Sequence, residues 1–198
     1  MNYWKKGCNY LLDNDPVFKY YYNPNHQLKT NKNKFDVLFK SICSQQISVS
    51  AAMSIYKNSK SIIGPINFKN FITNKSKIKN LPLSKNKKKC LISLLNNYHL
   101  VTDIKLSNSN FEKVNNNLTQ IFGIGKWTAE MFSIFYLGLP NIMPLGDLGF
   151  INAYKKYYRD KNLSKFSVHS NKWRNYSTIV TWYLWSSYDS EPLYLILS

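Results

Sequence analysis

Apolar side chains recur at three- and four-residue steps along almost the whole chain. One such stripe predicts a buried helix face, and it consists of Phe35, Leu38, Phe39, Ile42 and Cys43. The alternation of apolar and polar positions that marks a half-buried strand is scarce. The pattern therefore predicts an all-α protein, a compact helical bundle.

Capping residues and helix breakers divide this pattern into separate helices. Ser, Asn and Asp side chains cap N-termini by accepting backbone N–H bonds, whereas Gly and Pro end helices. The helices expected are Val49 to about Lys60 after Ser48, Asn67–Asn74, a helix after Ser84 that buries Cys90 and Leu94, a short helix from Ser109 or Asn110 to Leu118, Lys126–Leu137, Leu148–Tyr158 after Asp147, and Ser170–Tyr188. Loops or solvated helix ends are expected at Lys29–Lys34, Lys75–Asn80 and Lys85–Lys89.

Two glycines interrupt the apolar pattern just before Lys126. Gly123 and Gly125 can adopt positive φ and leave backbone N–H groups accessible. The amides and the dipole of the helix that follows point to the same place, and together they attract an anion. A DNA phosphate would fit there without any reading of sequence. The alternative is an ordinary tight turn, which two glycines on their own favour.

A single carboxylate, Asp147, stands just before a helical pattern. An Asp in that position is most often an N-cap, and its carboxylate then accepts helix N–H bonds. A chemical role is compatible with capping. An ionised carboxylate beside a sugar C1′ atom can stabilise an oxocarbenium-like transition state or orient a water molecule.

The charge of the chain permits a nucleic-acid partner without establishing one. The 198 residues include 27 Lys and Arg against 10 Asp and Glu, a net charge of +17 that attracts polyanions at long range. However, Arg159 and Arg174 are the only arginines, and Asn, Ile and Tyr are frequent. An AT-rich genome would impose the same composition on any protein, so both explanations of the charge stay open.

The cysteines and the apolar runs indicate the compartment. Cys8, Cys43 and Cys90 are widely spaced, so disulfides, a zinc site and an iron–sulfur cluster are not expected, and a reducing compartment is favoured. The first residues lack the apolar run of a signal peptide, and no run is long enough for a membrane span. A soluble intracellular protein is expected. The three histidines match no motif and are expected at the surface.

Five segments carry a family pattern, and they follow one another along nearly the whole chain. They are Asp15-Pro16, Ser44–Ser48 with Ala51-Ala52, Leu118–Ala129 (LTQIFGIGKWTA), Pro144–Gly149 (PLGDLG), and Trp173–Tyr176 with Trp182–Trp185. In this order they resemble the helix-hairpin-helix DNA glycosylase superfamily, and its 3-methyladenine, alkylation-repair branch in particular. The chain departs from that pattern at Asn175, where the branch usually has Pro, and at Ser177, where it usually has Arg.

The resemblance implies one domain, residues 1–198, with two helical lobes flanking a base-binding cleft. One lobe would span residues 35–137 and include the hairpin, residues 118–130; the other would join residues 1–34 to residues 138–198. It also implies a monofunctional DNA glycosylase that flips a damaged purine out of duplex DNA, hydrolyses its N-glycosidic bond and leaves an abasic site. The expected protein is a monomer that binds double-stranded DNA and no membrane, and works with DNA in the cytoplasm or nucleoid, or in a nucleus.

The same resemblance implies a role for each matching residue. Catalysis would fall to Asp147; the base pocket to Trp127, Met131, Leu148 and Trp185; phosphate binding to Gly123, Gly125, Lys126 and Thr128; and the duplex wedge to Gln46. No cofactor is required, but the backbone carbonyls of Thr119, Ile121 and Gly123 could hold a structural Na⁺ or K⁺. Core packing is the alternative role for Met131 and Trp185, and a hydrogen bond to a loop is the alternative for Gln46.

One position separates the two subclasses of this superfamily. Bifunctional glycosylase/lyases carry there a lysine that attacks C1′, but this chain has Trp127, and Lys126 is one residue away. One residue rotates a helical side chain by about 100°, so Lys126 should face DNA or solvent. Two alternatives remain open: a bifunctional glycosylase/AP lyase, and a non-catalytic helix-hairpin-helix DNA-binding module.

Overall fold

The computed structural model describes residues 3–105 and 110–188, and within these residues it contains helices and no strand. The prediction of an all-α protein is confirmed. The α-helices are α1 Tyr3–Asn14, α2 Lys34–Ser44, α3 Val49–Ile63, α4 Phe68–Thr73, α5 Lys85–Asn96, α6 His99–Thr102, α7 Phe111–Leu118, α8 Lys126–Phe135, α9 Leu148–Tyr158, α10 Phe166–Asn171 and α11 Ser177–Tyr188. None of the helices in this described part is long and apolar enough to span a bilayer.

The predicted N-caps explain where several of these helices begin. Ser48, Ser84, Asn110 and Asp147 each accept a hydrogen bond from the backbone N–H of the third residue after them. Each cap satisfies one of the amides that a first helical turn leaves without an intrahelical acceptor. Of the two residues expected to start α7, Asn110 is the cap, and Ser109 lies outside the described residues.

The chain divides into two compact units. The hairpin unit consists of residues 30–138, and the described part of the other, the aspartate unit, consists of residues 3–29 with residues 139–188. The expectation of a single domain stays a prediction.

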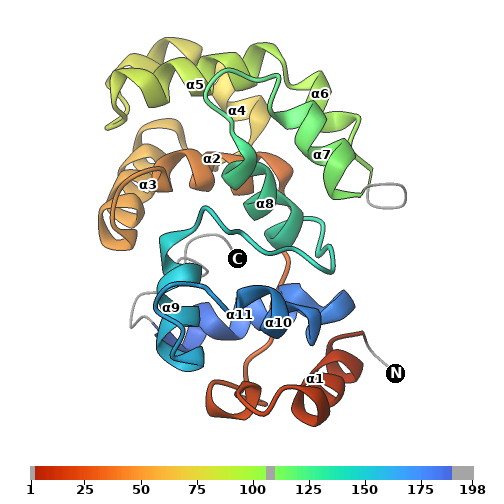
Figure 1. The fold of residues 1–198 in the computed structure, drawn as a ribbon. Helices are drawn as coiled ribbons and strands as arrows, with labels where there is room; N and C mark the ends of the chain where they lie inside the picture. Colours follow the sequence, from red (N-terminus) through yellow and green to blue (C-terminus); the bar gives the residue numbers. More distant parts are fainter. Residues whose placement is uncertain (1–2, 106–109, 189–198) are drawn as a thin grey trace. The chain divides into compact units, whose positions relative to one another are not determined.

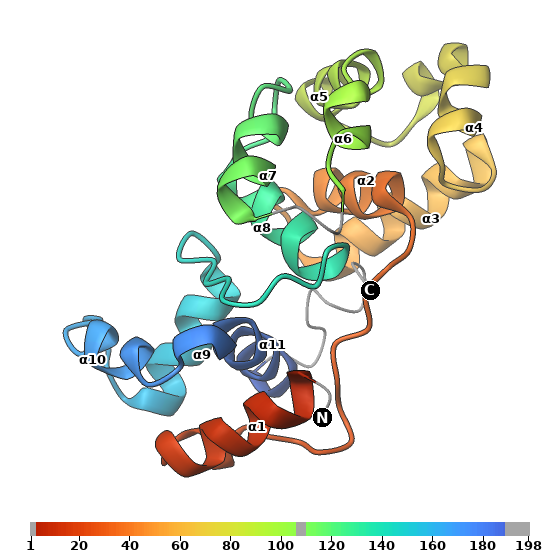
Figure 2. The ribbon, with the colours of Figure 1, turned by 90° about the vertical axis from the view of Figure 1, so that its right-hand side faces the viewer.

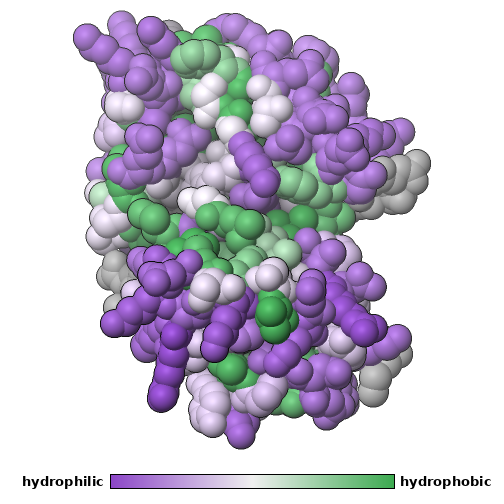
Figure 3. All heavy atoms as spheres, in the orientation of Figure 1, coloured by the Kyte–Doolittle hydropathy of each residue, from purple (hydrophilic) through white to green (hydrophobic). Residues whose placement is uncertain are grey.

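In the hairpin unit, α2 is the central helix. It contacts α3, α5 and α8, and α7 packs on α8 (Figures 1 and 2). The predicted stripe of α2 is fully buried, and its Phe35 and Phe39 rings pack against Phe71 of α4. Hydrophilic side chains cover much of the outer face of this unit, over α5 and α7 (Figure 3).

In the aspartate unit, α11 takes the central place and contacts α9 and α1 (Figure 2). Residues Ser177 to Trp185 of α11 are all buried, which is how a helix that is apolar on every face behaves. A buried carboxylate, Asp15, holds the surrounding elements together. It accepts hydrogen bonds from the Tyr158 hydroxyl and from the Trp173 indole N–H, the latter at 2.9 Å.

Three expectations about elements were wrong or incomplete. The last helix does not run unbroken from Ser170, because α10 ends at Asn171, a 3₁₀ turn covers Arg174–Tyr176, and α11 begins at Ser177. The break lets the Trp173 indole reach Asp15. A 3₁₀ turn, rather than a loop, covers Lys75–Asn80, and α1 was not expected at all.

The expectation of surface histidines was wrong for His169. Its ring is half-buried, and its Nδ1 atom lies 2.8 Å from the hydroxyl oxygen of Tyr154. The Tyr154 hydroxyl in turn donates a hydrogen bond of 2.9 Å to Asp160, a buried carboxylate that also accepts from the Lys165 amide. His169 is therefore part of a hydrogen-bonded cluster in the aspartate unit.

Candidate functional site

The carboxylate of Asp147 is held in a defined position at the start of α9. Its Oδ1 atom accepts two hydrogen bonds, from the Phe150 amide at 2.8 Å and from the Trp185 indole N–H at 3.0 Å. Asp147 is half-buried, in the extended conformation usual for an N-cap. Hydrogen bonds to a charged acceptor are each worth about 1.5–3 kcal/mol, so the carboxylate has a fixed orientation.

The role of Trp185 differs from the expected one. Its side chain is only 3% exposed, and the indole N–H points at Asp147 rather than serving only as an apolar wall. Leu148, the next residue after the carboxylate, is 76% exposed and can therefore contact a ligand. The structure thus brings Asp147, Leu148 and Trp185 together in one unit.

Gly149, two residues after the carboxylate in the PLGDLG segment, lies where the structure leaves little room for a side chain. A Cβ atom at this position would lie 3.1 Å from Asp147 Oδ1 and 3.5 Å from the Trp185 ring. That space is tighter than an ordinary van der Waals contact, so a side chain would press on the carboxylate. Glycine leaves room for the Asp147–Trp185 hydrogen bond.

In the hairpin, Gly123 is required by the fold itself. Its φ is +82°, in the left-handed region that glycine adopts without strain. A Cβ atom there would lie 2.7 Å from Cβ and 2.9 Å from Sγ of Cys90 on α5. The backbone of the hairpin therefore rests directly on α5, and Ser93 Oγ of the same helix accepts a hydrogen bond from the Phe122 amide.

Gly125 has a different reason to be a glycine. The expectation of positive φ was wrong here, because its φ is −106°, which any residue can adopt. A Cβ atom at Gly125 would meet nothing within 4 Å, and no side chain caps α8. Packing within the protein does not require glycine at this position. A ligand that closely approaches the first amides of α8 would require it, because a side chain would stand in its way.

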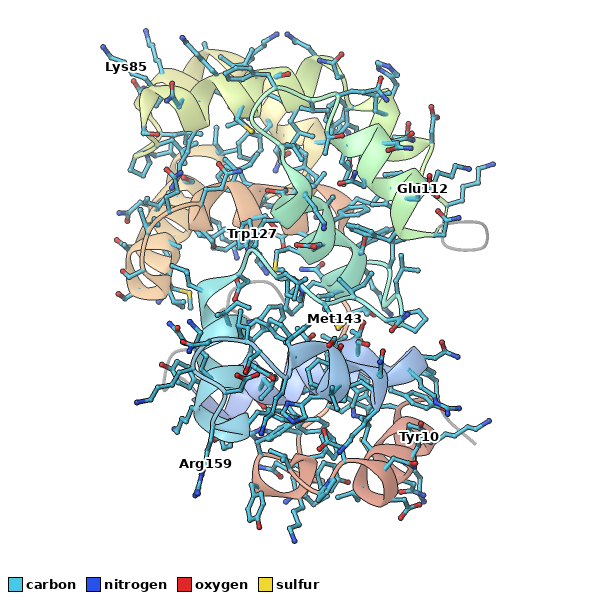
Figure 4. All side chains as sticks on the ribbon, viewed as in Figure 1. Tyr10, Lys85, Glu112, Trp127, Met143 and Arg159 are labelled. Carbon is cyan, nitrogen blue, oxygen red and sulfur yellow. The ribbon has the colours of Figure 1, made fainter. Side chains whose placement is uncertain are left out.

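The residues after Gly125 divide between outside and inside. Lys126 is exposed, as expected, with its Nζ atom 3.8 Å from Glu130. Thr128 is only 1% exposed, and its Oγ1 atom lies 3.4 Å from Gln45 Nε2 in the interior of the unit, so its expected contact with a phosphate stays a prediction. Trp127 is half-buried at the start of α8 (Figure 4), whereas Met131, one turn later, is fully buried. Met131 is therefore a core residue of the hairpin unit.

The turn after α2 contains one expected residue and one that sequence reasoning missed. Gln46, the expected wedge, is exposed and has a φ of +57°. Its neighbour Gln45 reaches the hairpin, where its Nε2 atom lies 3.0 Å from the Gly123 carbonyl and 3.4 Å from Thr128 Oγ1. The repeated glutamine at these positions was the available signal, but sequence alone does not show which of the two points inward.

The backbone carbonyls of the hairpin are the groups that the expected cation would bind. The Ile121 carbonyl accepts from the Ile124 amide at 3.0 Å, and the Gly123 carbonyl accepts from Gln45. Each carbonyl oxygen has a second lone pair, so the set with Thr119 is chemically suited to a monovalent cation. In the described part of the chain, no group of three or more His, Cys, Asp or Glu side chains could hold a metal ion.

Known proteins resemble this chain over most of its length. A DNA-3-methyladenine glycosylase of Saccharomyces cerevisiae is 30% identical over an alignment of 209 positions, and the alignment covers 93% of this chain and 71% of the yeast protein. The chain belongs to the DNA-3-methyladenine glycosylase family. DNA-3-methyladenine glycosylase 1 of Schizosaccharomyces pombe is 29% identical over an alignment of 180 positions, which covers 84% of this chain and 77% of that protein. No family model matches the chain.

Solved structures of this family have the same fold. A 3-methyladenine DNA glycosylase of Schizosaccharomyces pombe, in complex with abasic DNA, matches with a TM-score of 0.74 and 25% identity over 94% of this chain and 98% of that one. A DNA-3-methyladenine glycosidase of Bacillus halodurans matches with a TM-score of 0.73 and 25% identity over 97% and 94%. Both confirm the all-α fold.

Proposed function

We propose that this protein is a monofunctional DNA glycosylase that hydrolyses the N-glycosidic bond of alkylated purines in duplex DNA and leaves an abasic site. One observation carries the proposal: Asp147, at the position that the family pattern assigns to catalysis, is oriented by two hydrogen bonds to its Oδ1 atom. The names of the relatives support the substrate class. A non-catalytic DNA-binding module would need the capping bond from the Phe150 amide but not the second bond from the Trp185 indole.

The proposed reaction needs few catalytic groups besides this carboxylate. An alkylated purine carries positive charge, so it is already a good leaving group. As the bond to C1′ breaks, positive charge develops on the sugar, and an ionised Asp147 nearby stabilises it or orients the attacking water. The hydrogen bonds from Phe150 and Trp185 hold the carboxylate ready, so that no reorganisation is needed during the reaction.

Water, rather than an amine, is the proposed nucleophile. A lyase would need a lysine at Trp127, and the neighbouring Lys126 is exposed on α8. Trp127 is proposed to contact the damaged base instead. The electron-rich face of an indole attracts a cationic purine through a cation–π interaction.

The hairpin is the proposed DNA-binding element. The amides at the start of α8 would bind a phosphate, and the open space at Gly125 would let the phosphate approach. Gln46 is the proposed wedge, since it is exposed on the turn after α2. The proposed partner is duplex DNA with a damaged purine, bound by a monomer, and the proposed location is inside the cell with the genome.

A Na⁺ or K⁺ at the hairpin is a proposal of the same kind. The carbonyls of Thr119, Ile121 and Gly123 would hold it, and its charge would strengthen phosphate binding. No step of the reaction requires it.

The substitution Asp147→Asn tests the catalytic role. Asn can still cap α9, so the fold should persist, but the negative charge is removed. We expect release of 3-methyladenine or 7-methylguanine from alkylated duplex to fall by about 10²-fold or more, while DNA binding is retained. Asp13→Asn, an exposed carboxylate of α1, is the matched control and should leave base release unchanged.

The product distinguishes the subclasses in the same assay. The parent protein should leave an intact strand that is cut only after alkali, and borohydride should trap no covalent adduct. Efficient trapping would favour the lyase. Near-normal base release by a folded Asp147→Asn protein would remove Asp147 from catalysis.

A further inference from the structure

Gln45 joins two elements of the hairpin unit that the proposed function uses separately. The side-chain amide has two N–H groups, so it can donate to the Gly123 carbonyl and to Thr128 Oγ1 at the same time. These two acceptors stand at either end of the segment that contains Gly125, the proposed phosphate site. Gln45 is therefore bonded across the segment that would bind the phosphate.

The backbone at Gln45 leads directly into the proposed wedge. Gln45 is the C-cap residue of α2, and Gln46 follows with a φ of +57°, a backbone conformation that residues other than glycine and asparagine rarely adopt. Such a conformation persists where the surroundings impose it. The bonds of Gln45 on one side supply part of that constraint.

Helix α5 contacts both the end of α2 and the hairpin. The Lys87 ammonium group donates a hydrogen bond of 2.9 Å to the Cys43 carbonyl near the end of α2. Cys90 lies against Gly123, and Ser93 Oγ accepts from the Phe122 amide. The end of α2 and the hairpin thus rest on one helix, and the Gln45 side chain links them to each other.

We propose that Gln45 is a positioning residue that couples the phosphate-binding hairpin to the Gln46 wedge, so that the two act on DNA as one rigid element. This inference rests on the proposed function. Gln45 itself contacts neither DNA nor the damaged base. Its effect is to set the distance between a bound phosphate and the residue that enters the duplex when a base is flipped.

Gln45→Met tests the coupling, because Met keeps the length of the side chain and removes both donors. We expect undamaged-duplex affinity to change by less than about twofold and the preference for an abasic-site duplex to fall about three- to tenfold, the effect of one net hydrogen bond. Amide hydrogen exchange at residues 122–128 should accelerate. Gln27→Met is the matched control, because Gln27 is an exposed glutamine of the aspartate unit, outside the hairpin.

Gln46→Ala provides the background that separates positioning from general stability. If Gln45 acts through the wedge, Gln45→Met should have little further effect on abasic-site preference in the Gln46→Ala protein. An undiminished effect there, or an equal loss of affinity for both duplexes, would overturn the inference. Both measurements use binding alone, so a parent protein that released no base would refute the proposed function and leave the coupling test intact.

Discussion

At the scale of single residues, some glycines of this chain are required by the fold and others only by the proposed function. Gly123 is required because of its φ and its contact with Cys90, whereas Gly125 meets no such demand from within the protein. Gly149 lies between these cases, since the chain could accept a side chain there only by moving the Asp147 carboxylate. Substitutions at these positions therefore have distinct expected outcomes.

Gly149→Ala should lower activity without lowering the melting temperature. Alanine favours a helix over glycine by about 1 kcal/mol, so the melting temperature should stay equal or rise. The new Cβ atom would press on Oδ1 of Asp147, and base release should fall about tenfold because small misplacements of a catalytic group are costly. Asn152→Ala, at an exposed position of the same helix, is the control for helix propensity. Unchanged base release by Gly149→Ala would show that the carboxylate tolerates the shift.

At the scale of elements, the hairpin combines an internal support with an external binding surface. Its inner side rests on α5 through Cys90 and Ser93, and its outer side presents the start of α8. The same division applies in the aspartate unit, where one end of α9 bears Asp147 and its middle bears Tyr154 of the buried cluster. Each element therefore has one region that stabilises and another that is available to a ligand.

Alanine substitutions at Gly123 and Gly125 should distinguish the supporting side of the hairpin from its binding side. Gly123→Ala should lower the melting temperature, because it places Cβ in a left-handed conformation against Cys90. Gly125→Ala should leave the melting temperature unchanged and weaken binding to damaged and undamaged duplex alike, since Cβ would meet only the phosphate. Thermal melts and duplex titrations measure the two effects. Full DNA affinity in Gly125→Ala would mean that the hairpin is a plain turn.

The cluster around His169 predicts a dependence of stability on pH. Burial is the main cause that lowers the pKa of His169; Lys172 and Lys165 lower it further, and Asp15 and Asp160 partly offset them. Because the folded protein then binds the proton less tightly than the unfolded chain, this contribution to stability is present above the unfolded pKa, about 6.5, and is lost as the pH falls through the folded value. His169 is only partly buried, so the effect is small.

Melting temperatures at pH 8 and pH 5 check this prediction. The difference between them should be smaller in His169→Gln than in the parent protein, because the group that gains a proton on unfolding is gone. His26→Gln, at an exposed position of the same unit, should leave the difference unchanged. An unaltered difference in His169→Gln would remove the histidine from the acid response.

At the scale of the whole molecule, a net charge of +17 has two explanations, codon bias and DNA binding. The positions of individual lysines allow these two explanations to be distinguished. Lys126 stands beside the proposed phosphate site, whereas Lys69 lies on α4, which Figure 2 shows at the opposite side of the hairpin unit from the turn between α7 and α8. Lys85, at the start of α5, also lies at the outer edge of the unit (Figure 4).

Salt titrations of two lysine variants test which charges act on DNA. If Lys126 neutralises a phosphate, Lys126→Gln should reduce the slope of log K against log salt by about one unit, because one fewer counterion is released. Lys69→Gln should leave the slope unchanged. Equal changes in both variants would mean that the charge acts as a diffuse field rather than through particular contacts.

The sequence by itself determined the elements whose causes are local. Caps at Ser48, Ser84 and Asp147 set the starts of three helices, because a side chain and an amide three residues later need no other part of the chain. Family membership was likewise readable from the order of short segments. The prediction of an unbroken last helix was wrong: at the break, the Trp173 indole donates a hydrogen bond to Asp15, which is far away in sequence.

Only the tertiary structure decided which atoms meet across long separations in the chain. It directed the indole N–H of Trp185 onto the Asp147 carboxylate, placed Cys90 under Gly123, and gave Gln45 rather than Gln46 the bonds to the hairpin. In each case the partner lies at least thirty residues away along the chain. Side-chain direction there follows from how helices pack, and helix packing is a property of the folded core that periodicity and spacing do not contain.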